Sequence, residues 1–291
     1  MKSAVKSLAG RLGINTHDIL FLIFERNAAS VLERKFSKSD AATRDLVRSE
    51  DERYHYGDTE VTERAMETVL ASFTLDRIAF IKKHTVFGKN QVVADLGDSN
   101  GIFLRSCGRD GMSVNISDPA VVALHDKGME AVKAHIEHLP FRDNSIHTVF
   151  LFETLEHVPN PVLLLNEIGR VCSGDLILSI PYVEKTNVHP YNYDPSRPIY
   201  QHHIFEFDKK DFASLITHTP FFIMAEEVVA VMDERRTIRD RLVFYLWHRF
   251  IEQDTFCGCF KRFYICRLSK KPAGPARVPL RKNRHGTGSS E

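Results

Sequence analysis

From Gln91 onward, short apolar runs alternate with segments that have the periodicity of helices. This alternation is typical of βαβ units, which place consecutive strands in one mainly parallel sheet with helices on its faces. Seven strands are expected in this part of the chain. They lie near residues 91–96, 112–117, 133–137, 147–153, 174–181, 221–232 and 259–268. The pattern therefore predicts an α/β fold.

Helix starts are marked between several of these strands. Asp118-Pro119 and Asn160-Pro161 each pair a polar N-cap with proline at the first helical position, where its missing N–H costs nothing. A third helix is expected from Asp208 to about Thr217, with Asp208 as an acidic N-cap. An amphipathic helix is expected over 238–250, between the last two strands.

The remaining chain divides into three further regions. Residues 1–88 are predicted to form a helical N-terminal cap, with helices near 18–36 and 61–83, ahead of an α/β domain over 89–269. Residues 182–203 form a loop rich in Pro, Tyr and His, which is long for a structureless connection and is therefore a candidate lid or insertion. Residues 270–291 are basic and rich in Gly, Pro and Ser, so we expect a disordered tail.

Net charge, cysteine content and apolar runs limit the partners and the cellular compartment that we expect for the protein. The 291 residues carry a formal net charge of +1, which gives no overall attraction to nucleic acid. The five cysteines are odd in number and scattered, and no signal-peptide pattern is present, which favours the cytoplasm. The longest apolar run, Ile19 to Phe24, is much shorter than the ~20 residues that a bilayer-spanning helix needs. Peripheral membrane contact and the oligomeric state stay open.

The first expected strand ends in Asp95-Leu96-Gly97-Asp98-Ser99-Asn100-Gly101. A glycine-rich turn between a strand and a helix lets the backbone approach a ligand, while helix N–H groups point into the crevice. Asp95 could orient a positively charged amino group, Gly97 permits the close approach, and Gly101 lets the next helix pack on the sheet. A ligand is therefore expected at the carboxyl edge of the sheet.

A second acidic residue follows Asp95 at a sequence separation that is typical of nucleotide-binding folds. Asp118 is expected to close the second strand, 23 residues after Asp95, close to the ~20-residue interval at which nucleotide-binding α/β folds place a ribose-binding carboxylate. This spacing indicates a cofactor that contains a nucleoside. Asp118 could also only cap the helix that begins at Pro119, and a carboxylate has enough lone pairs for both roles.

Three further segments follow the glycine-rich turn in a fixed order. They are His138-Leu-Pro-Phe-Arg-Asp-Asn-Ser145, Leu155-Glu-His-Val-Pro-Asn-Pro161 and Glu167-Ile-Gly-Arg-Val171. Together with the turn they resemble the class I S-adenosylmethionine-dependent methyltransferases, particularly the group with the ubiquinone/menaquinone-methyltransferase pattern. The resemblance covers about residues 90–216. It implies a Rossmann-like seven-stranded sheet with one antiparallel strand near its end, and S-adenosylmethionine as cofactor.

The resemblance also implies a set of cofactor-binding residues. Those of the turn would surround the methionine part of the cofactor, Asp118 would bind the ribose, 135–137 would contact the adenine, and 152–153 would lie beneath the methyl donor. The full set is Asp95, Gly97, Asp98, Ser99, Gly101, Asp118, His135, Ile136, Glu137, Phe152 and Glu153. Three positions depart from the common pattern, because Ser99 replaces a glycine and His135 and His147 replace acidic residues.

Catalytic residues are less marked than cofactor-binding ones. Methyl transfer needs alignment and, where the nucleophile is protonated, removal of a proton. His189, His202 and His203 lie in or beside the candidate lid and could act as a base, or they could be ordinary exposed loop residues. His157 is expected to fix the local turn. We expect no metal site, because Cys257, Cys259 and Cys266 lack the paired spacing of a zinc site.

Two functions follow from this reading. The first is an S-adenosylmethionine-dependent methyltransferase that acts on an oxygen, nitrogen or carbon nucleophile of a small or lipid-like molecule. The second is a non-catalytic subunit of the same fold that binds another protein. The sequence shows no aromatic and basic surface for nucleic acid, so no nucleic-acid partner is expected.

Overall fold

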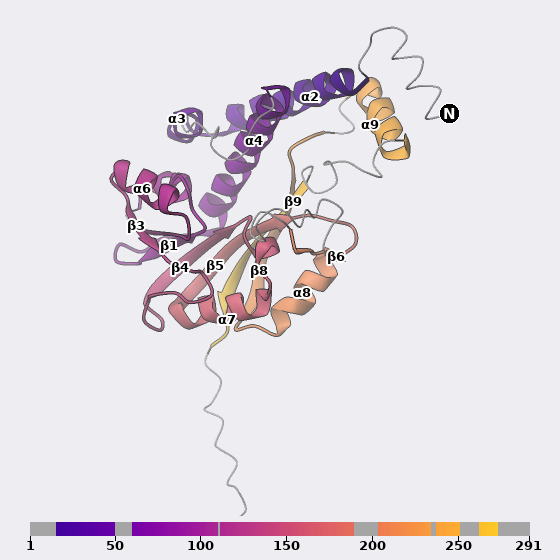
Figure 1. Ribbon diagram of the computed structural model, residues 1–291. Coiled ribbons are helices and arrows are strands. Elements are labelled where there is room, and N and C mark those ends of the chain that lie inside the picture. The colour runs from indigo at the N-terminus through magenta and orange to yellow at the C-terminus, as the bar shows by residue number, and fades with distance from the viewer. Residues whose placement is uncertain are drawn as a thin grey trace, which may run out of the picture.

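The computed structural model describes residues 16–49, 60–109, 111–188, 203–233, 237–250 and 262–272. Seven strands form one sheet in the order β3-β2-β1-β4-β5-β9-β8 (Figure 1). Their bounds are β1 (Val93–Leu96), β2 (Met112–Asn115), β3 (Glu130–Lys133), β4 (Ile146–Phe152), β5 (Cys172–Pro181), β8 (Phe221–Ala230) and β9 (Arg262–Lys270). All seven strands predicted from the sequence are present.

The strand directions confirm the predicted sheet. The first five strands pair in parallel, whereas β9 pairs antiparallel with both β5 and β8. Parallel neighbours bring the carboxyl ends of β1, β2 and β4 to the same edge of the sheet. The fold is therefore α/β, mostly parallel, with one antiparallel strand.

Helices cover both faces of this sheet. They are α5 (Ile102–Ser106), α6 (Asp118–Asp126), α7 (Pro161–Val171) and α8 (Lys209–Thr217), whereas α9 (Ile238–Phe250) lies beside an N-terminal helix (Figure 1). Along β4 the side chains alternate between two cores, since Leu151 packs with α7 and α8 while Phe150 packs with α5 and α4 (Glu60–His84). Burial on both faces explains why the strands read as continuous apolar runs.

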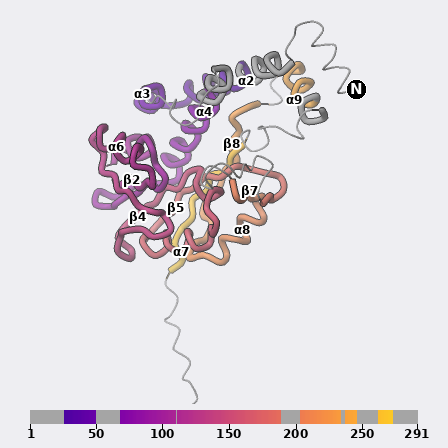
Figure 2. The backbone as a smooth tube through the Cα atoms, in the orientation of Figure 1, coloured from indigo at the N-terminus to yellow at the C-terminus, as the bar shows by residue number. Residues whose placement is uncertain are grey.

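The N-terminal helices are α2 (Thr16–Lys38), α3 (Ala41–Ser49) and α4. The later part of α4 lies against the sheet on the face opposite α7 and α8 (Figures 1 and 2). There Phe73 stacks on Phe263 of β9 with ring centroids 3.6 Å apart. Lys35 fastens α2 to this frame, because its Nζ donates to Asp76 Oδ2 of α4 at 2.6 Å and to the carbonyl of Ala230 at 2.9 Å.

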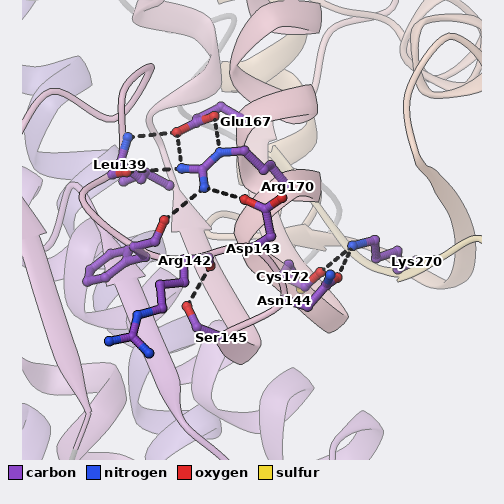
Figure 3. A network of polar contacts seen from close by, with 10 residues as sticks. Leu139, Arg142, Asp143, Asn144, Ser145, Glu167, Arg170, Cys172 and Lys270 are labelled. Atoms are coloured by element: carbon purple, nitrogen blue, oxygen red, sulfur yellow. Dashed lines mark hydrogen bonds and ion pairs between the residues drawn. The ribbon is translucent and has the colours of Figure 1, made fainter.

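Arg170 of α7 secures the segment between β3 and β4 (Figure 3). Its guanidinium donates to both carboxylate oxygens of Glu167, at 2.7 and 2.9 Å, and to Asp143 Oδ1 at 2.8 Å. It also donates to the carbonyl oxygens of Leu139 at 3.0 Å and Phe141 at 2.8 Å. Two of the segments that carry the family resemblance thus meet here to hold the chain in place.

Some element boundaries differ from the predictions. The strand expected at 133–137 is β3 at Glu130–Lys133, so residues 134–137 follow the strand. Asp118 does not close β2, which ends at Asn115; Asp118 is the first residue of α6, and Ser117 is its N-cap. In contrast, Asp208 caps α8 as expected, accepting from the backbone N–H of Lys210 and Asp211.

The candidate lid at 182–203 is described at its base only. There β6 (Asn187–Val188) pairs antiparallel with β7 (Phe205–Glu206). His189 and His202 lie outside the described residues, as do Cys257, Cys259 and the tail from 273 onward. Among the helices that are described, none is long and apolar enough to span a membrane.

Candidate functional site

The turn after β1 lies at the carboxyl edge of the sheet. Gly97 and Gly101 both adopt the left-handed backbone conformation, with φ of 84° and 75°. A Cβ on Gly97 would lie 2.7 Å from Thr154 Oγ1, and one on Gly101 would lie 1.9 Å from Met129 Sδ. Both glycines are therefore required by the turn itself, both for conformation and for space.

Asp98 organises the inside of this turn. Its Oδ1 accepts from the backbone N–H of Asn100 at 3.0 Å and of Gly101 at 2.8 Å, and its Oδ2 accepts from Ser113 Oγ at 2.7 Å. Asn115, the last residue of β2, donates to the carbonyl oxygen of Asp98 at 2.6 Å. The turn is thus prearranged by protein groups from two neighbouring strands.

Asp95 differs from Asp98, because its carboxylate is buried and one of its two oxygens accepts no hydrogen bond from the described residues. The residue is 2% exposed, and within the described part of the chain its Oδ2 has no hydrogen-bond partner. Burial and the neighbouring Asp98 raise the pKa of Asp95 well above its ordinary value, while Arg77 opposes the shift. A buried carboxylate oxygen of this kind suits a positively charged ligand group.

Arg77 of α4 supplies a buried positive charge to the site. Its guanidinium carbon lies 4.0, 4.8 and 5.5 Å from the ring centroids of Phe73, Phe103 and Phe152, respectively. Its charge also lowers the pKa of Glu153 against the effect of burial. Sequence reasoning missed Arg77, because α4 precedes β1 and no motif marks the residue.

Glu153 follows the last residue of β4, Phe152, as expected from the sequence. It holds a left-handed backbone conformation with φ of 46°, which is uncommon for a residue with a side chain. Its Oε1 accepts from Ser179 Oγ of β5 at 2.9 Å. Burial raises the pKa of Glu153 above the usual range of glutamate. Such strained and charged residues concentrate at functional sites.

The candidate ribose residue, Asp118, lies farther out than Asp95. Its side chain is 71% exposed and pairs with Lys133 Nζ of β3 at 2.6 Å. Asn115 occupies the end of β2 instead, and its Oδ1 accepts from the backbone N–H of Ser117 at 2.9 Å. The carboxylate would therefore have to leave Lys133, or share it, to reach a ligand.

The predicted adenine contacts lie in the turn that follows β3. His135 is exposed and sits 3.6 Å from the Glu137 carboxylate, measured from Nδ1 to Oε2. Ile136 packs against the core beneath α7 and α8. All three residues lie near the carboxyl end of β3, so they share an edge with the turn after β1.

Two of the residues that depart from the family pattern, Ser99 and His147, lie at opposite ends of the strands. Ser99 lies in the turn after β1 and is partly buried. His147 instead lies near the amino end of β4, where its two ring nitrogens are 2.8 Å from Gln91 Nε2 and 3.0 Å from Thr148 Oγ1. The replacement at His147 is therefore remote from the turn, at the opposite edge of the sheet.

A second polar cluster lies just beyond Glu153. Glu156 and His157, in the short helix η2 (Leu155–His157), come together with His203. The rings of His157 and His203 pack edge to face, with their centroids 4.9 Å apart. His203 Nδ1 lies 2.9 Å from Glu206 Oε1. Sequence reasoning weighed His157 and His203 separately, because they are 46 positions apart in the chain. Of the three candidate bases, His203 is thus the one whose position the structure describes.

Comparison with known proteins agrees with this architecture. Residues 94–179 match a family model described as a methyltransferase domain. This match runs from β1 through η2 and α7 into β5. No curated protein sequence matches the chain at a significant level.

Three solved structures align with this chain at low sequence identity. A complex of the Haloferax volcanii Trm112 methyltransferase activator with a proposed methyltransferase aligns with a TM-score of 0.50 and 16% identity, over 68% of this chain and 88% of that one. Magnesium protoporphyrin IX methyltransferase from Synechocystis, solved with bound S-adenosylmethionine, aligns at 0.49 and 14%, over 79% and 92%. A Methanosarcina mazei S-adenosylmethionine-dependent methyltransferase aligns at 0.47 and 16%, over 65% and 96%.

The family match and the sheet order support the same conclusion. The matched segment contains the turn after β1 and the strand ends that surround it. The sheet around it has the strand directions that the sequence resemblance implied. Residues 94–179 are therefore similar to a methyltransferase domain, and they lie in a sheet with the strand directions that such a domain would have.

Proposed function

We propose that this protein binds S-adenosylmethionine at the carboxyl edge of β1, β2 and β4 and transfers its methyl group to an acceptor. The observation that carries the proposal is Asp95, whose buried Oδ2 lacks a partner among the described residues beside a preformed glycine turn. The cofactor has a matching group, since its methionine end carries an ammonium. Pairing with that ammonium would offset the cost of burying the carboxylate.

The surrounding residues fit the rest of the cofactor. The turn from Gly97 to Gly101 would border the methionine part, and Asp118 or the adjacent Asn115 would meet the ribose hydroxyls. Residues 135–137 would border the adenine. Phe152 and Glu153, which end β4, would lie beneath the sulfonium. When bound, the cofactor supplies an activated methyl group, and the protein's task is to align it with the acceptor.

The acceptor would enter between the end of β4 and the base of the 182–203 loop. The described ends of this loop are anchored there, because the Ile204 N–H donates to the carbonyl oxygen of Glu156 at 2.6 Å. His203 lies at this place, with Glu206 fixing its ring. We propose a small or lipid-like acceptor with an oxygen, nitrogen or carbon nucleophile, and His203 as the residue placed to accept its proton.

A non-catalytic role is the second candidate, and one observation favours it. The edge strand β8 presents Phe222, Met224 and Val228 with substantial exposure. An edge strand with apolar side chains is a surface on which a second protein could dock. This function would not need a cofactor, so cofactor binding separates the two candidates.

Isothermal titration with S-adenosylmethionine and S-adenosylhomocysteine tests the proposal. We expect one saturable site, and Asp95→Asn should weaken it at least about tenfold, because a charged hydrogen bond contributes about 1.5–3 kcal/mol. Asp126→Asn is the matched control, since Asp126 is an exposed residue at the end of α6. Its affinity should equal that of the wild type. Absence of heat and of thermal stabilisation at millimolar ligand would contradict cofactor binding.

A further inference from the structure

The cluster beyond Glu153 is enclosed by protein and rich in titratable groups. Glu156 is 1% exposed and His203 is 8% exposed, and Glu206 is also buried. One ligand-type atom from each of Glu156, His157 and His203 lies within 4.8 Å of the others. These side chains come from η2 and from the residues just before β7, two segments that the Ile204–Glu156 backbone hydrogen bond joins.

Glu156 carries the unusual feature of this cluster. Both of its carboxylate oxygens are buried, and neither accepts a hydrogen bond from a donor group within the described part of the chain; the carboxyl group within hydrogen-bonding contact is that of Glu153. The nearby carboxylates of Glu153 and Glu206 raise the pKa of Glu156 in addition to the effect of burial. Buried carboxylates that face one another require a positive charge between them or beside them, which is either a proton or a cation.

The histidines favour a cation. Glu206 holds His203 through Nδ1, and this arrangement, in which a carboxylate binds the imidazole nitrogen opposite the metal, is the usual support of a metal-binding histidine. His157 places its ring against that of His203 from the other segment. A proton shared between two carboxylates would need neither ring nor the supporting glutamate.

We propose that Glu156, His157 and His203 bind a divalent transition-metal ion, with Zn²⁺ as the best match. Two imidazoles and one carboxylate are a common donor set for this ion, whereas Mg²⁺ and Ca²⁺ prefer oxygen ligands. Ligand atoms around a tetrahedral zinc lie about 3.4 Å apart for bonds of about 2.1 Å, so the three ligand atoms, now within 4.8 Å of one another, would approach by up to about 1.4 Å on binding.

Three protein ligands leave one position on the ion. Glu153 neighbours Glu156 in this cluster, at the edge where the acceptor would enter. If the proposed methyl transfer is correct, the ion would replace His203 as the group that activates the acceptor, because a metal-bound imidazole held by Glu206 has no nitrogen free to accept a proton. The open position would then take water or an oxygen of the acceptor, which favours acceptors that carry a hydroxyl or enol group. That refinement rests on the proposed function, but metal binding itself does not.

Titration of the full-length, untagged protein with Co²⁺, without S-adenosylmethionine, tests the site. Four-coordinate Co²⁺ absorbs visible light strongly, so we expect a spectrum that saturates at one ion per chain and is displaced by Zn²⁺. Glu156→Gln and His157→Ala should each lower the affinity at least about tenfold, and Glu206→Gln about 10–100-fold through loss of the supporting bond. His218→Ala is the matched control, because His218 is exposed at the end of α8.

Circular dichroism of each variant shows whether the fold is kept, and the glutamine variants preserve side-chain volume if His157→Ala unfolds. A protein without a saturable Co²⁺ spectrum would overturn the proposal, and so would a spectrum that all three variants retain. The outcome is independent of cofactor binding. Metal binding without S-adenosylmethionine binding would refute the proposed function alone, and the reverse result would refute the metal site alone.

Discussion

Ser113 of β2 and Asp98 of the turn after β1 are joined by a 2.7 Å hydrogen bond between two buried side chains. The second carboxylate oxygen of Asp98 accepts the backbone N–H of Asn100 and of Gly101. One side chain thus ties the turn to the neighbouring strand and satisfies two backbone donors. The conformation of the turn after β1 therefore depends on the Asp98 side chain, without any ligand.

Asp98→Ala should lower the free energy of unfolding by about 1–3 kcal/mol, because the buried N–H of Gly101 loses its acceptor. It should also weaken S-adenosylmethionine binding at least about tenfold, since the turn would no longer be held. Urea denaturation and calorimetric titration measure the two effects. Ser113→Ala removes one bond and should have the smaller effect on both; a larger effect would contradict this role of Asp98.

Asp95→Asn should increase the stability of the folded protein and weaken its binding of the cofactor. The raised pKa means that folded Asp95 keeps a proton above about pH 4, where the unfolded residue has lost it. The wild type therefore loses stability through Asp95 as the pH rises from about 4 through the folded pKa. The variant has no such loss, so its advantage should grow with pH, while its cofactor affinity falls.

Urea denaturation of both proteins between pH 4 and pH 8 checks this prediction. The difference between the two proteins isolates Asp95, since carboxylates with lowered pKa, such as Glu167, contribute equally to both. A difference that stays constant or shrinks with rising pH would show that burial of Asp95 is compensated.

Gly101→Ala should destabilise the protein by about 1–2 kcal/mol through backbone conformation alone, because φ is 75° at this residue. The added Cβ would also collide with Met129 Sδ. Met129→Ala makes room for the Cβ at position 101 but does not relieve the strained backbone conformation there. The double variant should therefore recover only the part of the loss that arises from the collision, which a double-mutant cycle in urea measures. Full recovery would show that conformation costs nothing here.

Arg170→Lys should lower the melting temperature clearly, although the charge is kept. The planar guanidinium donates at once to Glu167, Asp143 and two backbone carbonyls, and one ammonium cannot reproduce that fork. We expect a loss of about 1–3 kcal/mol in the free energy of unfolding, within the usual range for a destabilising substitution. Cofactor affinity of the folded variant should be unchanged. A variant that keeps its stability but loses binding would place Arg170 in the site.

Strand and helix order was predictable because the periodicity of this sequence is local. Asp208 capped its helix as expected, and all seven strands appeared. The strand ends were less predictable, since residues 134–137 are as apolar as β3 itself but turn away after Lys133. Asp118 was placed on β2 for the same reason, because Ile116 extends the apolar run although the strand ends at Asn115.

The part of the candidate site that one continuous segment forms was predictable from the sequence. The part that tertiary contacts bring together was not. The turn from Asp95 to Gly101 is continuous in sequence, and its geometry follows from its glycines. Arg77 reaches the site from a helix that precedes the sheet, and His203 meets Glu156 only through tertiary contacts between distant segments. No spacing rule connects residues that are brought together in this way.

The position of β9 has a consequence for synthesis on the ribosome. β9 lies between β5 and β8, so β8 cannot join the sheet until β9 has arrived. About 80 residues separate the end of β5 from the start of β9, which takes about 4–16 s to translate at 5–20 residues per second. Throughout that interval the hydrogen-bonding edge of β5 faces the cell unpaired, and the nascent chain is most open to misassociation and to chaperones.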